Sequence, residues 1–101
     1  MDVLLSYNDG IALLKVEGTI TSVNSSLFQE KLDEVQKSEA VKLEIDFSEC
    51  NNINSMGIGK ILTFHKEFAS KNKQVEIVKC TLQIYELFMT IKLDSLIPIK
   101  L

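Results

Sequence analysis

The sequence predicts a single α/β domain over residues 1–101, with a mixed sheet that opens with a β-hairpin and helices mainly on one face. Apolar and charged residues alternate strictly over residues 41–47, the pattern of a strand with one buried face. A parallel strand covered on both faces would be apolar throughout, so the helices should lie mainly on one side. Apolar residues then recur at helical spacing over residues 58–69, so strand and helix alternate along the chain.

The hairpin is predicted from two short strands, residues 3–7 and 11–16, on either side of Asn8-Asp9-Gly10. These three residue types tolerate the positive φ angles of tight hairpin turns. Gly18 indicates a bulge or bend where the chain leaves the second strand. A loop rich in hydroxyl groups follows, and it could face a partner.

The first helix is expected to run to about Lys37, with three candidate caps at residues 24–26. Ser26 and Gln29 have the spacing of a capping box, in which the two side chains satisfy backbone amides at the helix start. The opposite face of this helix carries charges of both signs. That arrangement is typical of a solvated surface rather than a binding site.

After the strand at 41–47, residues 48–52 are expected to form a polar loop that leads into the helix over 58–69, with Asn72 as its C-terminal stop. A short strand at 75–79 and a third helix around residues 84–91 follow. Residues 96–99 are expected to close the sheet. Because Pro98 cannot donate a ladder hydrogen bond, such a strand belongs at an edge or an end.

Composition and charge exclude several classes of function. The formal net charge is −3, and the 11 basic residues are all Lys, spread along the chain, which disfavours nucleic-acid binding. No apolar run reaches the roughly 20 residues that span a bilayer, and the N-terminus lacks the basic start of a signal peptide, so we expect a cytosolic protein without membrane insertion. Cys50 and Cys80 lack CxxC spacing and are expected to be reduced, partly buried thiols.

Catalysis and cofactor binding are not expected. His65 is the one histidine, and there is no cluster of metal-ligating residues. Gly57-Ile58-Gly59 resembles the start of the Gly-x-Gly-x-x-Gly fingerprint of dinucleotide-binding proteins, but Leu62 stands where that fingerprint has its third glycine. A phosphate-loop reading of Gly59-Lys60 fails because Ile61 replaces the required Ser or Thr.

The candidate site is Ser55, which falls at the turn between the strand at 41–47 and the next helix. The first backbone amides of a helix lack internal partners and carry the positive end of its dipole, so a hydroxyl or phosphate there meets a favourable field. If Ser55 is the cap, a backbone amide occupies its hydroxyl; if Asn54 is the cap, the hydroxyl is free. Gly57 and Gly59 indicate either close packing on the sheet or close approach of another protein's backbone, and both can hold together.

This order of motifs resembles STAS domains, the bacterial anti-sigma factor antagonists. The segment 45–48 followed by 53–59 is similar to their strand end and their Asp-Ser-(Ser/Ala)-Gly-Leu-Gly signature. Residues 17–21 resemble the family's Gly-Glu-Leu-Asp segment, and residues 75–88 its later strand and helix. Ser55 falls at the family's phosphorylated serine.

The resemblance implies a switch without cofactor or catalysis of its own. A serine kinase that is itself an anti-sigma factor would bind the unmodified domain and phosphorylate Ser55, and a serine phosphatase would reverse the change. The implied partner-binding residues lie in two segments of this sequence: Thr21 and Ser22, and then Asn54, Ser55, Met56, Gly57, Ile58 and Gly59.

Three residues depart from the family pattern. Asn54 replaces the usual Asp, Met56 replaces a small Ser or Ala, and Thr21 replaces an acidic residue. Loss of an acidic residue beside the Ser55 hydroxyl affects recognition by a kinase and changes the electrostatic repulsion that acts on a phosphate there. These departures keep a second hypothesis open, a non-phosphorylated STAS-like scaffold or assembly subunit in a signalling or lipid-transport complex.

Overall fold

The computed structural model describes residues 2–101, which form the predicted hairpin, mixed sheet and three α-helices. The elements in chain order are β1 (Asp2–Asn8), β2 (Ile11–Ile20), α1 (Ser25–Lys37), β3 (Lys42–Ile53), α2 (Ser55–Ala69), β4 (Gln74–Cys80), α3 (Leu82–Thr90) and the short 3-10 helix η1 (Leu93–Ser95).

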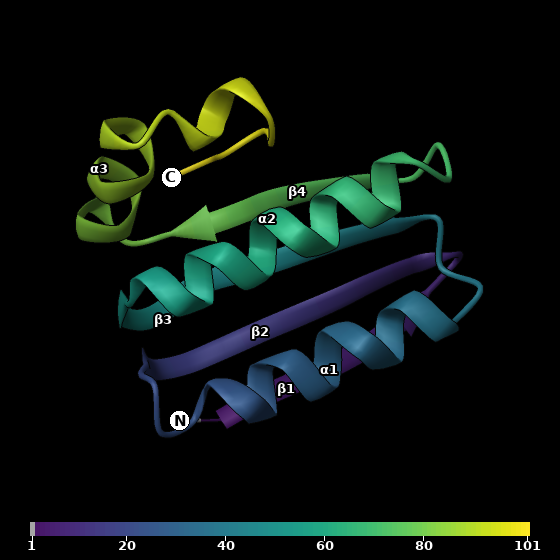
Figure 1. The fold of residues 1–101 in the computed structure, drawn as a ribbon, viewed down its shortest axis with the longest axis horizontal. Helices are drawn as coiled ribbons and strands as arrows, with labels where there is room; N and C mark the ends of the chain where they lie inside the picture. The colour runs from purple at the N-terminus through teal and green to yellow at the C-terminus, as the bar shows by residue number, and fades with distance from the viewer. Residues whose placement is uncertain (1) are drawn as a thin grey trace.

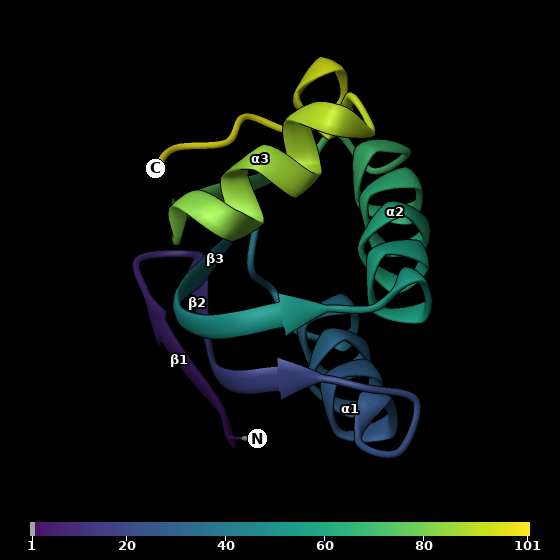
Figure 2. The same cartoon turned by 90° about the vertical axis from the view of Figure 1, so that its left-hand side faces the viewer.

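The four strands lie in the order β1-β2-β3-β4, with β1 and β2 antiparallel and the other two pairs parallel. Helices α1 and α2 run side by side along the same side of the sheet (Figure 1). The turned view shows α1 and α2 together on one side of the strands, with α3 above β3 (Figure 2). The rings of Phe47 in β3 and Phe88 in α3 meet edge to face, 5.9 Å between centroids, and this contact packs α3 onto the sheet.

The two faces of β3 have opposite character. Leu43, Ile45 and Phe47 are fully buried beneath the helices, whereas the alternate residues are only partly buried on the other face. There the Lys42 ammonium lies 3.3 Å from the Glu44 carboxylate and 3.0 Å from that of Glu76 in β4. The expected arrangement of helices mainly on one face is therefore confirmed.

The prediction of a polar loop at residues 48–52 is wrong, because β3 continues to Ile53. Strand β2 also extends further than expected, to Ile20, and the two extensions pair in parallel, with Glu17 beside Glu49 and Gly18 beside Cys50. Register shifts on both sides of Gly18, whose φ is +97°, confirm the predicted bulge. Backbone pairing with β2 holds this segment extended despite its polar side chains.

The capping box at Ser26 and Gln29 is also wrong, since Ser26 lies inside α1. Asn24 occupies the cap position, but its side chain is used elsewhere. Its Oδ1 accepts a hydrogen bond from the Thr21 amide at 2.8 Å, and its Nδ2 donates to the Thr19 carbonyl at 2.9 Å. These bonds order the β2–α1 loop rather than the first turn of the helix.

The C-terminal predictions are confirmed in part. Asn72 has φ of +61° just after α2, as expected of a helix stop. Residues 96–99 form no full strand: Ile99 makes one parallel bridge to Ile77 at the outer edge of β4. The Pro98 carbonyl accepts a hydrogen bond from the Ile77 amide. The bridge therefore uses the carbonyl of the proline and does not need the backbone N–H that proline lacks.

Both cysteines are free, as predicted, and they are more fully buried than the partly buried thiols that were expected. Burial raises the pKa of both thiols above their ordinary value, which favours the protonated form.

Candidate functional site

The candidate site begins where β3 passes into α2. Asn54 has extended backbone angles, and its side-chain oxygen accepts a hydrogen bond from the Gly57 amide at 2.9 Å. Its carbonyl accepts from the Ile58 amide at 3.1 Å, the first bond of the helix. Asn54 is therefore the cap, and Ser55 is the first helical residue, which settles the two alternatives that the sequence left open.

Ser55 is exposed, and its hydroxyl makes no hydrogen bond within residues 2–101. The backbone amides of Ser55 and Met56 donate none to the described part of the chain either, as expected for the first turn of a helix. This turn contains no acidic residue, and the Asn54 cap is neutral. No acidic side chain of this turn or its cap therefore compensates the positive end of the helix dipole, and an anion on Ser55 would be stabilised there.

The β2–α1 loop lies against this turn. The Asn54 amide donates to the Ile20 carbonyl at 3.2 Å, and the Ser25 hydroxyl donates to the Met56 sulfur at the same distance. The fold therefore brings the two predicted segments together, with Thr21 half-buried and Ser22 exposed. The Thr21 hydroxyl accepts hydrogen bonds from loop amides, so its direct role is to shape the loop.

The two glycines have different environments. A Cβ on Gly57 would lie 2.7 Å from Cγ1 of Ile53 and 2.9 Å from Cγ2 of Ile20, so close packing of the helix start on the sheet requires this glycine. A Cβ on Gly59 would meet nothing within 4 Å. Gly59 is exposed one helical turn after Ser55, on the same side of α2. Packing thus explains Gly57 and leaves Gly59 open to an approaching molecule.

Two exposed apolar side chains complete this surface. Met56 is 50% exposed beside Ser55, and Val23 in the β2–α1 loop is 90% exposed. Sequence reasoning did not single out Val23, although an apolar residue among hydroxyl-bearing neighbours was the available signal. Exposed apolar side chains beside polar ones are typical of protein interfaces.

The family model of the STAS domain matches residues 3–101. The chain belongs to the STAS domain family. No curated protein matches its sequence.

Solved structures of similar fold include an anti-sigma factor antagonist from Mycobacterium paratuberculosis, 19% identical, with a TM-score of 0.88 over 97% of this STAS domain and 83% of that chain. A putative anti-sigma factor antagonist from Thermotoga maritima is 18% identical, with a TM-score of 0.86 over 96% and 84%. Unphosphorylated SpoIIAA, another anti-sigma factor antagonist, is 11% identical, with a TM-score of 0.83 over 99% and 89%. At these identities the similarity establishes the fold.

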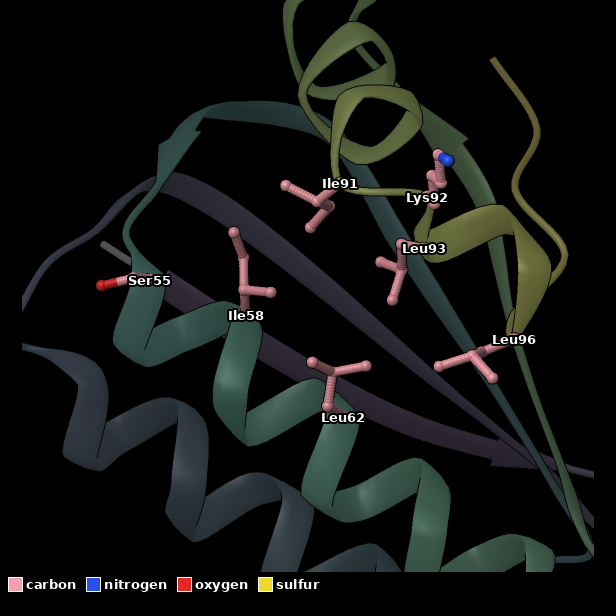
Figure 3. A pocket seen from close by; sticks show the side chains of 7 residues that line it. All are labelled: Ser55, Ile58, Leu62, Ile91, Lys92, Leu93 and Leu96. Carbon is pink, nitrogen blue, oxygen red and sulfur yellow. The ribbon is translucent and has the colours of Figure 1, made fainter.

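A hollow of about 360 Å³ adjoins the site of this STAS domain, between α2 and the segment 91–96 (Figure 3). Ser55, Ile58 and Leu62 line it from α2, and four residues of the opposite segment complete it: Ile91, Lys92, Leu93 and Leu96. Sequence reasoning missed this hollow, because it depends on how α3 and η1 pack relative to α2.

Other chemistry-bearing groups of the STAS domain do not form a second centre. No group of three or more His, Cys, Asp or Glu residues within residues 2–101 is placed to hold a metal ion. The described helices include none that is long and apolar enough to cross a membrane. His65 is partly buried, and its Nδ1 atom has no hydrogen-bond partner in the described chain.

Proposed function

We propose that this STAS domain is an anti-sigma factor antagonist that binds a cognate anti-sigma factor, itself a serine kinase, and is switched off by phosphorylation of Ser55. A serine phosphatase would restore the binding form. The domain acts by binding and needs no catalytic group or cofactor of its own. Its proposed partners place it in the cytoplasm.

The observation that carries this proposal is the free hydroxyl of Ser55. Because Asn54 supplies the cap, the Ser55 hydroxyl is exposed and not committed to the helix. A kinase can therefore modify it without first breaking a capping bond. The same surface carries Met56 and Val23, which offer apolar area to a partner, and Gly59, where a partner's backbone can approach closely.

A phosphate on Ser55 would act on the interface rather than on the fold. It adds about −1.5 to −2 charges, which the uncompensated start of α2 accommodates. A partner that packs over Met56 and Gly59 would have to desolvate or repel that charge. We therefore expect modification to weaken partner binding while the stability of the domain is kept or raised.

The test combines site mapping with binding measurements. Candidate serine kinases of the anti-sigma type are incubated with the domain and ATP, and phosphate is located by mass spectrometry. We expect modification at Ser55, loss of modification in Ser55→Ala, and no change in Ser6→Ala, which removes an exposed hydroxyl from β1, outside the predicted partner-binding segments.

Binding to the same kinase is then measured for Ser55→Asp and Ser55→Asn. The two variants are similar in size, and only the first carries a charge. We expect Ser55→Asp to bind at least about tenfold more weakly, a difference of about 1.4 kcal/mol, and Ser55→Asn to stay near the parent value. Phosphate found elsewhere, or unchanged binding by Ser55→Asp, would contradict the switch.

A second candidate function is that of a scaffold or assembly subunit that is never phosphorylated. The observation that favours it is Met56, which is half exposed, is held by the Ser25 hydroxyl, and presents an apolar group beside Ser55. On this hypothesis Ser55→Ala keeps both partner binding and cellular function. Met56→Ala, which removes apolar contact area, weakens the complex, and no phosphorylated form is recovered from cells.

A further inference from the structure

The hollow between α2 and the segment 91–96 has the composition of a small-molecule site. Five of its seven lining residues are aliphatic, and Lys92 is the one charged residue among them. In Figure 3 the side chains of Ile58, Leu62 and Leu93 occupy the space between the two segments. Ile91 and Leu96 are 44% and 55% exposed, so apolar surface here is open to solvent. An apolar ligand that filled the hollow would remove this surface from water.

Lys92 is placed where its side chain lacks a partner. It makes no ion pair within residues 2–101, and it is exposed. Its φ is +60°, just after the end of α3, where Gly or Asn is the usual residue. The other described non-glycine residues with positive φ are Asp9 and Asn72, types that tolerate this conformation. The chain thus keeps a lysine in the lining of the hollow at a position that its backbone disfavours. Its ammonium is directed away from Ile58 and Leu62 in Figure 3, so the exposed side chain turns toward the hollow when it pairs with a ligand.

We propose that this hollow binds a small amphiphilic anion, an aliphatic chain that ends in a carboxylate, with the chain against Ile58, Leu62 and Leu96 and the carboxylate paired to Lys92. The volume of about 360 Å³ is within the range of small-molecule sites. An aliphatic lining with a single cation matches a ligand with one apolar body and one negative group.

Two other hollows of the fold differ in chemistry from this one. One contains His65, Lys73, Gln74 and Glu76 among its lining residues, and another contains Ser6, Asn8 and Glu44. Each has charges or hydrogen-bonding groups spread around it, which disfavours an aliphatic chain. The hollow beside α2 is distinguished from both by its mainly aliphatic lining and by having a cation, Lys92, as its one charged residue.

The proposal does not depend on the phosphorylation of Ser55. The Ser55 side chain stands at one end of the hollow with its hydroxyl directed away from the other lining side chains (Figure 3). Ligand binding is measured on the domain alone, without kinase or ATP. Failure of the proposed switch would leave the ligand result unchanged, and the reverse also holds.

The test is a titration of the 15N-labelled domain with sodium decanoate below its micelle concentration, followed by amide chemical shifts. We expect saturable shifts at Ile58, Leu62 and residues 91–96. Hexanoate and octanoate should bind more weakly, by up to about fourfold for each methylene lost from a buried chain. Decylamine, which has the same chain and the opposite charge, should bind more weakly than decanoate.

Two variants separate the roles of charge and shape. Lys92→Gln should weaken decanoate binding about two- to fivefold, the range of exposed ion pairs, and leave the binding of neutral decan-1-ol unchanged. Lys37→Gln, at an exposed lysine in the last turn of α1, is the matched control and should change neither. Leu62→Trp fills the hollow and should abolish binding of both ligands, with the thermal midpoint recorded to show that the variant is folded.

Two results would overturn the proposal. The first is that decanoate leaves the amides of residues 55–62 and 91–96 unshifted; if an amphipathic helical peptide then shifts these amides, the hollow is a protein-docking groove instead. The second is that decylamine binds as tightly as decanoate, which would indicate unspecific apolar adsorption.

Discussion

The outer face of the sheet, which is the face away from α1 and α2, differs from the start of α2 in how its polar groups are paired. On the outer face, both carboxylate oxygens of Glu76 have partners, Lys42 at 3.0 Å and Lys100 at 3.1 Å. At the start of α2, the Ser55 hydroxyl and the amides of Ser55 and Met56 have none within residues 2–101. The apolar side chain of Met56 is also half exposed there.

This difference separates groups that hold the fold from groups that are available for binding. A polar group already paired within the protein must lose that partner before it can bind another molecule, which costs free energy. An unpaired group gives up only its hydrogen bonds to water when it binds. We therefore expect the start of α2 to be the better binding surface, although the outer face carries more charge. Substitutions at four positions test this contrast.

The largest effect is expected at Gly57, the buried residue through which the start of α2 packs on the sheet. Gly57→Ala places a Cβ within 3 Å of Ile53 and Ile20, so the helix start must shift or the core must rearrange. We expect the free energy of unfolding to fall by about 1–3 kcal/mol, measured by urea denaturation. An unchanged midpoint would show that the packing under α2 is looser than these distances imply.

The next largest effect is expected at Glu76, whose carboxylate is paired on the outer face of the sheet. Glu76→Gln removes the carboxylate that links Lys42 in β3 to Lys100 in the C-terminal segment, and should lower the free energy of unfolding by about 1–2 kcal/mol. Glu67→Gln is the control, because Glu67 is exposed on α2 and makes no described ion pair. An equal loss in both variants would mean that general charge balance, and not pairing, matters.

The same carboxylate predicts a pH dependence. Hydrogen bonds from Lys42, and then from Lys100, hold the pKa of Glu76 below its ordinary value. Since the folded pKa is the lower one, the stabilisation is complete above the unfolded pKa of about 4.3 and is lost as the pH falls through the folded value. The stability difference between the parent and Glu76→Gln should therefore be constant near neutrality and shrink in acid. Urea denaturation at pH 7 and at pH values below 4.3 checks this.

A smaller effect is expected at the cap. Asn54→Ala removes the acceptor of the Gly57 amide and should cost about 1 kcal/mol. Asn54→Asp keeps the acceptor and adds a negative charge at the helix start, so its stability should equal or exceed that of the parent. Thermal denaturation of the three proteins gives the order. If Asn54→Ala matched the parent, the Ser55 hydroxyl would have to be supplying the cap in its place.

The smallest effect has the opposite sign. Gly59→Ala adds a Cβ in open space inside a helix, and should raise the free energy of unfolding by about 0.5–1 kcal/mol. If a partner's backbone approaches this position, the same variant should bind that partner more weakly despite its greater stability. A loss of stability on urea denaturation would show that the exposed side of α2 is more crowded than Gly59 indicates.

The elements themselves were predictable because their signals are local. Alternation over 41–47, helical spacing over 58–69 and the turn at residues 8–10 each depend on neighbours in the sequence. The extension of β3 was missed because Glu49 and Cys50 are held by pairing with Glu17 and Gly18, far away in the chain. The capping box failed because α1 already begins at Ser25, so Ser26 lies inside the helix and not at its cap; the Asn24 side chain, at the cap position, bonds to the preceding loop.

The sequence by itself determined that Asn54 and Ser55 stand at a helix start, with two glycines following. It could not decide which of the two caps the helix, nor that Gly57 is buried while Gly59 is open. Only the tertiary structure decided these points, and with them the hollow lined by Ile58 and Lys92. The physical reason is that a cap and a helical period arise within a few residues, whereas the free space around a side chain depends on segments that the fold brings from elsewhere.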